Sequence, residues 1–238
     1  MSFRRLVLTW SALWLVATFA QSVPTRSLQV VCIGDSLTEG DGDDQGLGYP
    51  GRLRASLPRG SRLTNLGKSG WTSEMALNGY EGKPAQLTLA LQQKPDLALV
   101  WLGSNDLWYL YEYANPTPSQ EKADLSRYEH NMATMISRLK AAGCQVALGL
   151  LDDQSRRPVA VQGRAFTGIS KAELQQMSRQ VAAYNSVLRK LAAQHGCQLV
   201  DTDQGGVFTD PALLNEDGNH PNASGYAKIA RLWVKALP

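Results

Sequence analysis

Four short segments, far apart in this sequence, carry the residue types that a nucleophilic hydrolysis needs. Residues 34–37 read Gly-Asp-Ser-Leu and place Ser36 where an apolar run ends. The others read Asn-Leu-Gly-Lys-Ser-Gly at residues 65–70, Gly-Ser-Asn-Asp at residues 103–106 and Asp-Gly-Asn-His-Pro at residues 217–221. Together they supply a serine hydroxyl, backbone and amide donors, and an imidazole near a carboxylate. Hydrolysis of an acyl ester requires this set of groups.

Ser36 is the expected nucleophile of this set. A serine hydroxyl is a weak nucleophile unless a base takes its proton. His220 is the best candidate for the base, because His130 and His195 lie within predicted helices. Asp217 stands three residues before His220 and can reach the imidazole within one tight turn, where it would fix the tautomer and stabilise the protonated ring. The three residues are expected to form a catalytic triad.

Donors for the oxyanion are expected at three positions. Ser36 begins a predicted turn or helix, where backbone N–H groups are unpaired, and Gly70 would offer an N–H without an obstructing side chain. Asn105 would offer its side-chain NH₂ to the same oxyanion. Trp71 and Trp108 flank these positions, so they could contact the substrate, since aromatic faces suit acyl chains and sugar rings. Simple packing of the two rings is the alternative.

The elements that must position these residues alternate between strand and helix. Nearly continuous apolar runs, typical of parallel strands covered on both faces, predict strands at 28–33, 63–66, 97–102, 145–151 and 198–200. Apolar residues at helical spacing predict helices at 124–142 and 172–195. A last helix, at 223–237, is expected to close the domain. This pattern predicts an α/β fold, a three-layer sandwich around a mostly parallel sheet. Ligands bind beyond the carboxyl ends of such strands, so the four segments should converge on one edge.

Two stretches interrupt the regular alternation. Residues 106–123 are rich in aromatic side chains, and residues 152–170 contain several arginines. Both follow predicted strands on the carboxyl side, where long loops often shape a binding site. We therefore expect both stretches to be loops beside the site.

Composition and the N-terminal residues limit the classes of protein that remain. The chain has 238 residues, is 43% hydrophobic and carries a formal net charge of +3, which suits one globular domain and gives no basic stripe for nucleic acid. Two arginines precede an apolar run over residues 6–20, so residues 1–22 are expected to be a secretory signal peptide and residues 23–238 the folded domain. The alternative is an uncleaved anchor, although the run is short for a membrane span. The expected location is secreted or periplasmic.

Export makes a disulfide feasible among the three cysteines. Cys32 lies in the first apolar strand and is expected to be a buried free thiol. Cys144 and Cys197 each follow a helix and a glycine and open a strand, so a bridge between them and a pair of buried thiols remain equal alternatives. The sequence contains no Cys-x-x-Cys motif, so the cysteine spacing does not suggest a metal site.

Two weaker motifs have simpler explanations. Residues 41–46 resemble the start of a calcium loop, but Arg52 stands where the loop needs a bidentate carboxylate. We expect a solvated acidic loop that lines the cleft and disfavours anionic substrates. The glycosylation sequon at Asn222 lies beside His220, where a glycan would hinder the site, and is interpreted as accidental.

The four segments, in this order, resemble the SGNH (GDSL) hydrolase family, the flavodoxin-like serine esterases. The resemblance covers nearly the whole chain after residue 22. It implies a five-stranded parallel sheet of order 2-1-3-4-5 and no metal or organic cofactor. By the same resemblance Ser36 is the nucleophile, Gly70 and Asn105 are oxyanion donors, and Asp217 and His220 are the acid and base. That strand order places strands four and five side by side, which supports a Cys144–Cys197 bridge.

The sequence therefore predicts an exported serine esterase that works through an acyl-enzyme on Ser36. The expected substrates are small-molecule esters with short to medium acyl chains, such as aryl esters, lysophospholipids or thioesters. A carbohydrate acetyl esterase is the alternative within the same chemistry, and a non-catalytic carbohydrate-binding relative is the alternative outside it. No nucleic acid partner and no stable membrane insertion after signal cleavage are expected.

Overall fold

A computed structural model describes residues 26–112, 115–165 and 169–238, so the predicted signal peptide lies outside the described residues. Within this part of the chain the strands form one parallel sheet of order β2-β1-β3-β4-β5, as the family resemblance implied. The strands are β1 (Gln29–Gly34), β2 (Arg62–Asn65), β3 (Leu97–Trp101), β4 (Gln145–Gly149) and β5 (Gln198–Val200). Their bounds lie close to the predicted ranges.

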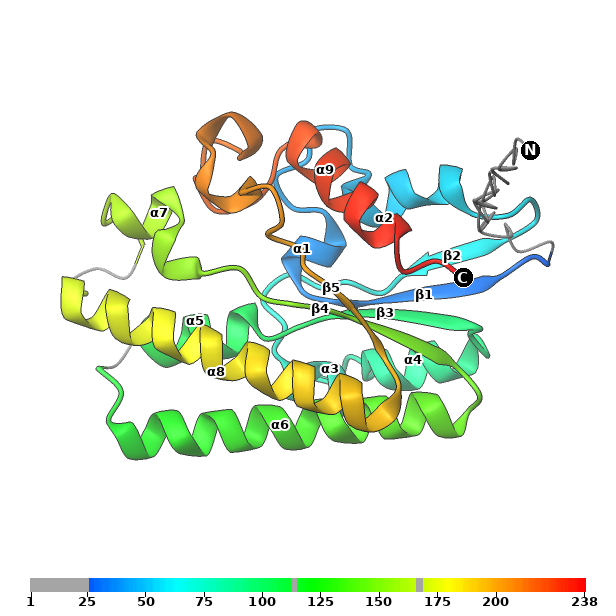
Figure 1. The fold of residues 1–238 in the computed structure, drawn as a ribbon, viewed down its shortest axis with the longest axis horizontal. Coiled ribbons are helices and arrows are strands. Elements are labelled where there is room, and N and C mark those ends of the chain that lie inside the picture. Colours follow the sequence, from blue (N-terminus) through cyan, green and yellow to red (C-terminus); the bar gives the residue numbers. More distant parts are fainter. Residues whose placement is uncertain (1–25, 113–114, 166–168) are drawn as a thin grey trace, which may run out of the picture.

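Helices cover both faces of the sheet and complete the predicted three layers (Figure 1). One face carries α1 (Ser36–Glu39), α2 (Gly48–Leu53) and α9 (Ala223–Val234). The other face carries α3 (Ser73–Asn78), α4 (Gln86–Gln92), α5 (Ser104–Glu112), α6 (Pro118–Ala141) and α8 (Lys171–His195). Short elements join them: α7 (Pro158–Val161) and the 3₁₀ turns η1 (Arg54–Ser56), η2 (Gln154–Arg156), η3 (Val207–Thr209) and η4 (Pro211–Leu213).

Local sequence signals set the bounds of the two long helices. Helix α6 begins at Pro118 because Thr117 and Gln120 form a capping box, six residues before the start predicted from the apolar spacing. Helix α8 begins after a capping box between Ser170 and Glu173. It ends at Gly196, whose φ of 61° lies in the left-handed region that favours glycine.

Large aromatic side chains fill the core on the α2 and α9 face. Tyr49 stacks on Trp233 with ring centroids 5.3 Å apart, and Trp101 from β3 meets both rings edge-on. Gly149 at the end of β4 allows this packing, because a Cβ atom there would lie 2.7 Å from the Trp101 ring. Fully burying a large apolar side chain stabilises a fold by roughly 1.5–3 kcal/mol, so this cluster ties α2 and α9 firmly to the sheet.

The expectation of a loop at residues 106–123 is wrong. Helix α5 occupies the first part of this stretch, since Leu107 and Tyr111 recur at helical spacing and both are buried. Tyr111 packs in a second small core with Ala160 from α7 and Met177 from α8. The arginine-rich residues 152–165 are partly ordered as η2 and α7. Both stretches therefore form packed walls at the carboxyl edge of the sheet.

The cysteines are free thiols, so the candidate Cys144–Cys197 bridge is not formed. Strands β4 and β5 are neighbours, but Ala147 pairs with Gln198, so the residues that follow the two cysteines are offset by two positions. The premise of a similar register was wrong. Cys32 is a buried free thiol as predicted, and burial raises its pKa to about 12.

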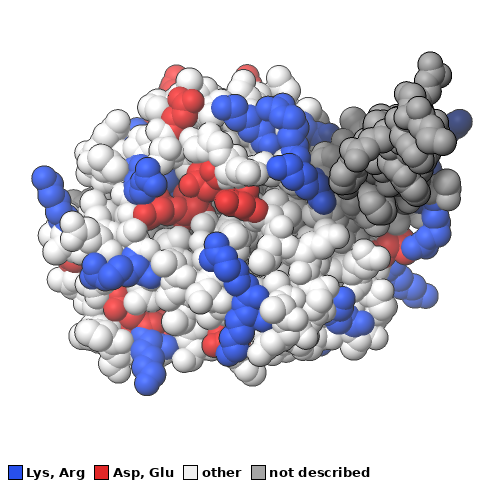
Figure 2. Space-filling model, viewed as in Figure 1, with Lys and Arg blue, Asp and Glu red and all other residues white. Residues whose placement is uncertain are grey.

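The surface carries no dominant charge on the face that Figure 2 shows. Basic and acidic side chains are both scattered over it, between larger areas of uncharged residues. Among the residues that the structure describes, no helix is both long enough and apolar enough to cross a bilayer.

Candidate active site

The parallel sheet brings the four segments to one edge. Ser36 opens α1 directly after β1, residues 67–70 follow β2, and Asn105 lies in the first turn of α5 after β3. Asp217 and His220 lie in the segment between β5 and α9. Because the carboxyl ends of all five described strands point the same way, residues up to 184 positions apart meet here.

Ser36, His220 and Asp217 form a hydrogen-bonded chain. The Oγ atom of Ser36 lies 3.0 Å from Nε2 of His220, and Nδ1 of His220 lies 2.6 Å from Oδ2 of Asp217. A carboxylate accepts the Nδ1 proton, which leaves the Nε2 lone pair to accept the proton of Ser36. Both contacts lie within the range over which a proton is transferred. The arrangement can raise the nucleophilicity of the Ser36 hydroxyl.

Asp217 also builds the turn that carries the histidine. Its Oδ1 atom accepts from the backbone N–H of Asn219 at 2.7 Å and of His220 at 2.9 Å, while Oδ2 holds the imidazole. Partial burial acts to raise the pKa of Asp217, but the hydrogen bonds from His220 and Asn219 outweigh it and lower that pKa to about 2. The carboxylate is therefore ionised throughout the neutral range.

The three groups predicted to donate to an oxyanion belong to Ser36, Gly70 and Asn105. Among the described residues, neither the Ser36 N–H nor the Gly70 N–H has an acceptor. Asn105 donates one amide hydrogen to the Trp71 carbonyl at 3.0 Å, which fixes the side chain and leaves its second hydrogen for a ligand. Gly70 has φ = 77°, a left-handed backbone that favours glycine, and its carbonyl accepts from the Tyr109 hydroxyl at 3.0 Å.

A buried polar network fixes the donor side from behind. The Asp106 carboxylate accepts from the Ser73 N–H at 2.9 Å and from the Ser73 hydroxyl at 2.6 Å. The Asn131 amide from α6 donates to the same hydroxyl at 3.0 Å. Burial raises the pKa of Asp106. The network joins the start of α3 to the start of α5, so the Gly70 and Asn105 segments hold a fixed separation.

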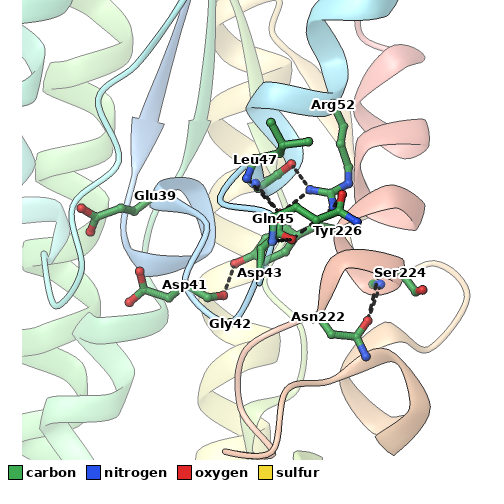
Figure 3. A network of polar contacts seen from close by, with 12 residues as sticks. Glu39, Asp41, Gly42, Asp43, Gln45, Leu47, Arg52, Asn222, Ser224 and Tyr226 are labelled. Carbon is green, nitrogen blue, oxygen red and sulfur yellow. Dashed lines mark hydrogen bonds and ion pairs between the residues drawn. The ribbon is translucent and has the colours of Figure 1, made fainter.

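Two carboxylates after Ser36 hold the loop of residues 67–70, here called the donor loop, by hydrogen bonds. Glu39 accepts from the Ser69 N–H at 2.5 Å, and Asp41 accepts from the Ser69 hydroxyl at 2.8 Å. Figure 3 shows both carboxylates on the same side of their segment. Gly67 makes the close approach feasible, because a Cβ atom there would lie 2.3 Å from the Glu39 nitrogen.

The expectation of a solvated acidic loop at residues 41–46 is wrong for Asp43. Its side chain is fully buried, forms an ion pair with Arg52 and accepts from the Gly48 N–H at 2.7 Å (Figure 3). Burial acts to raise the pKa of Asp43, but Arg52 and the backbone donors lower it overall. The arginine at the position that a calcium loop gives to a carboxylate is the partner that closes this loop.

Asp35, next to the nucleophile, is a buried carboxyl group. It is 1% exposed, and one of its oxygens accepts from the Leu37 N–H at 3.0 Å and so caps α1. Burial raises its pKa to about 7, because hydrogen bonding and the charge of Arg157 offset the loss of solvation only in part. The Asp35 carboxyl therefore gains or loses its proton near neutral pH.

The two tryptophans predicted to flank the donors are mostly packed. The Trp71 ring is 6% exposed and belongs to the main core, which favours the packing alternative for this residue. Trp108 is half-buried and packs against the small core around Tyr111. Tyr109 is more exposed, at 39%, and its hydroxyl lies on the donor loop. Of the three residues, Tyr109 has the largest exposed fraction.

Sequence reasoning missed a buried arginine that holds the histidine turn. Arg157 is 2% exposed and donates to both carboxylate oxygens of Asp152, at 2.8 and 2.6 Å. A third nitrogen, Nη1, donates to Oδ1 of Asn219 at 2.7 Å. The guanidinium also lies 4.6 Å from the centre of the Phe208 ring. The arginine-rich loop was recognised in the sequence, but no local signal distinguishes Arg157 from its neighbours.

Two further contacts from the same stretch reach the histidine turn. The Val159 N–H donates to the Gly218 carbonyl at 3.1 Å, and Arg164 donates to the Glu216 carbonyl at 3.0 Å.

Beyond the turn, Asn222 caps α9 by accepting from the N–H groups of Ser224 and Gly225, both at 3.0 Å (Figure 3). Its amide nitrogen donates to the carbonyls of Ala212 and Leu214. Both the oxygen and the nitrogen of the Asn222 side chain are therefore hydrogen-bonded within the protein.

The fold is that of the flavodoxin-like hydrolases, and a hydrogen-bonded serine, histidine and aspartate lie at the carboxyl edge of its sheet. Comparison with known families agrees, since the model of the GDSL-like Lipase/Acylhydrolase family matches residues 32–228. The chain belongs to this family and is a carboxylic ester hydrolase.

Its relatives include characterised sugar esterases. An acetylxylan esterase of Geobacillus stearothermophilus is 25% identical over 229 residues, covering 88% of this chain and 93% of the relative. An acetylxylan esterase of Xylanibacter ruminicola is 26% identical over 93% of this chain, which spans 46% of that longer protein. The solved Geobacillus esterase superposes with a TM-score of 0.63 at 22% identity, over 90% of this chain and 95% of that one, and so shares the fold. Its structurally characterised catalytic mutants replace a serine, an aspartate and a histidine.

Proposed function

We propose that this chain is an exported serine esterase that removes short acyl groups, acetyl above all, from carbohydrate esters. The observation that carries the proposal is the unbroken contact chain from Ser36 through His220 to Asp217, 3.0 and 2.6 Å long. No other described histidine has both a serine and a carboxylate within hydrogen-bond distance. We infer the roles of the individual residues from this geometry.

Acylation begins when the ester carbonyl lies above Ser36. His220 Nε2 takes the hydroxyl proton as Oγ bonds to the carbonyl carbon, and the carbonyl electron pair moves onto its oxygen. The N–H groups of Ser36 and Gly70 and the amide of Asn105 stabilise that negative charge, while Asp217 stabilises the imidazolium. The C–O bond to the alcohol then breaks, and the proton on His220 passes to the departing oxygen.

Deacylation repeats the same steps with water. His220 takes a proton from a water molecule, whose oxygen attacks the acyl carbon of the ester formed with Ser36. The tetrahedral intermediate occupies the same donors, and the Ser36 oxygen leaves with the proton from His220. The products are the free alcohol and a carboxylic acid, with Ser36 restored.

The choice of substrate rests on the relatives and on the rim of the site. Both named relatives are acetylxylan esterases, and one matches over nearly its full length. The described rim beside Ser36 carries Glu39, Asp41 and Ser69, which suit a sugar with hydroxyl groups better than an anionic lipid. Esters of longer acyl chains remain the second candidate, because the family includes lipolytic members by name.

The triad is tested by substitution and by covalent labelling. Ser36→Ala should abolish turnover of p-nitrophenyl acetate and labelling by a fluorophosphonate, since no other group in the site can form the acyl-enzyme. Ser224→Ala removes an exposed serine outside the site and serves as the matched control, with unchanged labelling. Turnover retained by Ser36→Ala contradicts the mechanism. Absence of any adduct on the wild-type protein favours a binding module.

The substrate is tested by a rate comparison across acyl lengths. Acetyl, butyryl and octanoyl esters of p-nitrophenol should be hydrolysed with falling kcat/KM, and acetylated xylan should release acetate. A rise in kcat/KM toward octanoyl, with no release from xylan, would transfer the proposal to longer acyl esters.

Export rests on the residues that lie outside the described part of the chain. We infer that residues 1–22 are removed as a signal peptide, because two arginines precede a short apolar run that ends in small residues. Mass analysis of the protein produced in a host with a secretion pathway should place the new N-terminus after Ala20 or Ser22. Recovery of the full chain in the cytosol would contradict this.

A further inference from the structure

The side chain of Asn219 has its orientation fixed by Arg157. A guanidinium has donors and no acceptor, so the Asn219 atom 2.7 Å from Arg157 Nη1 must be the amide oxygen. The amide nitrogen then points the opposite way. Arg157 cannot shift freely, because it is buried and held by both oxygens of Asp152.

The amide nitrogen of Asn219 points toward the imidazole of His220. Nδ2 of Asn219 lies 3.5 Å from Nε2 of His220, the atom that also faces Ser36 Oγ at 3.0 Å. At 3.5 Å the amide makes at most a weak contact with the imidazole. Asn219 is half-buried, so this NH₂ group is within reach of a ligand.

The departing oxygen of an ester must occupy the space beside Nε2. General acid catalysis needs that oxygen within about 2.6–3.2 Å of the nitrogen that protonates it. Because Asn219 Nδ2 lies 3.5 Å from Nε2, an oxygen placed on the Asn219 side of Nε2 is also within hydrogen-bond reach of the Asn219 amide. Negative charge develops on this oxygen as its bond to the acyl carbon breaks.

Resting on the proposed esterase function, we propose that Asn219 is a further catalytic residue, a hydrogen-bond donor to the leaving alcohol oxygen. The acyl C–O bond breaks with its electron pair going to oxygen, and the proton comes from His220 Nε2. Asn219 transfers no proton and stabilises the partial charge while the proton moves. Arg157 is a positioning residue, since it acts on the reaction only through the orientation of Asn219.

The proposal predicts a dependence on the leaving group that loop damage would not produce. An alkoxide or sugar oxygen needs stabilisation and protonation to leave, whereas p-nitrophenolate leaves with little help. Asn219→Leu should therefore lower kcat/KM for an acetylated sugar by about tenfold more than for p-nitrophenyl acetate, the cost of one hydrogen bond in the transition state. A series of substituted phenyl acetates should show a steeper fall of log kcat/KM with leaving-group pKa.

Two companion variants separate this role from a structural one. Asn219→Asp keeps an oxygen for Arg157 and removes the donor, so it should show the same selective loss even if the leucine variant folds poorly. Arg164→Gln loosens the same turn at Glu216 without touching Asn219, and should lower kcat/KM by the same factor on every ester. Thermal melts confirm that each protein is folded.

A double-mutant cycle tests the part of Arg157. Arg157→Met should reproduce the selective loss in the wild type and add little to it in the Asn219→Leu background, because the two residues act in series. Equal losses on sugar and p-nitrophenyl esters in both Asn219 variants would overturn the proposal while leaving the esterase function intact. Failure of the esterase function would appear instead as turnover that survives Ser36→Ala.

Discussion

The two sides of the candidate active site are built in different ways. On the donor side, Gly70 and Asn105 follow strand ends, and the buried Asp106–Ser73–Asn131 network joins their segments. On the base side, His220 lies in the segment between β5 and α9. It is held by contacts from the segment of the short elements η2 and α7, through Arg157 and Val159.

The difference separates what each side contributes. The network behind the donors is buried, so changes to Ser73, Asp106 or Asn131 should cost stability together with activity. The base-side residues of the hydrogen-bonded chain itself are partly exposed, with the Asp217 side chain 41% exposed, so changes at Asp217 should cost activity with little loss of stability. Measuring both quantities on variants from each side tests this division.

The largest effect is expected on the base side. Asp217→Asn keeps the shape of the turn but removes the charge that holds the imidazole tautomer, so kcat should fall about 10,000-fold, as in other triads. The midpoint of thermal unfolding should change little. A variant that unfolds at clearly lower temperature would show that the turn is part of the stable core, and the comparison would fail.

An intermediate effect is expected at Asp35, next to Ser36, in how the free energy of unfolding depends on pH. Because burial raises the pKa of Asp35 to about 7, the folded state binds its proton more tightly than the unfolded chain does. The resulting stability is fully present below about pH 4 and is lost as the pH rises to about 7, by up to about 4 kcal/mol.

Asp35→Asn keeps an acceptor for the Leu37 N–H and removes the titration. Urea unfolding of this variant should therefore show a flatter dependence of the unfolding free energy on pH between 4 and 7 than the wild type shows. Parallel curves for the two proteins would mean that Asp35 is not the group that titrates.

The smallest effect is expected on the donor side. Ser73→Ala leaves the buried Asp106 carboxyl and the Asn131 amide without their shared partner, which should lower the free energy of unfolding by about 1–3 kcal/mol. The value of kcat should fall with it, since the donor segments lose their brace. Ser224→Ala, at an exposed position, provides the control. A loss of activity at unchanged stability would break the division between the sides.

The sequence predicts the strands of the donor side well, because apolar runs mark where each strand ends. Apolar runs located β1, β2 and β3, and the rule that ligands bind at the carboxyl edge then placed Ser36, Gly70 and Asn105 together. It predicted α6 too short, because the apolar spacing fades before the capping box at Thr117. It predicted a loop where α5 forms, because the aromatic-rich stretch interrupts the regular alternation of elements, although Leu107 and Tyr111 pack inward.

The base side was predicted only as far as residue types allow. The spacing of Asp217 and His220 indicated a triad, but the partner of their turn comes from 62 residues away and depends on loop geometry. Nothing local marks Arg157 as the buried arginine, and the register that separates Cys144 from Cys197 is set by the pairing of β4 with β5. Contacts between irregular segments depend on the whole fold, so pattern alone does not reach them.

The fully engaged amide of Asn222 has a practical consequence for making this protein in eukaryotic cells. Oligosaccharide transfer there competes with folding, because the nitrogen that would be glycosylated donates to Ala212 and Leu214 once the chain closes. A molecule modified first would keep one amide hydrogen and lose at least one of these two hydrogen bonds at the cap of α9, next to the segment that carries the histidine. Such a host would deliver two populations, and a bacterial host one.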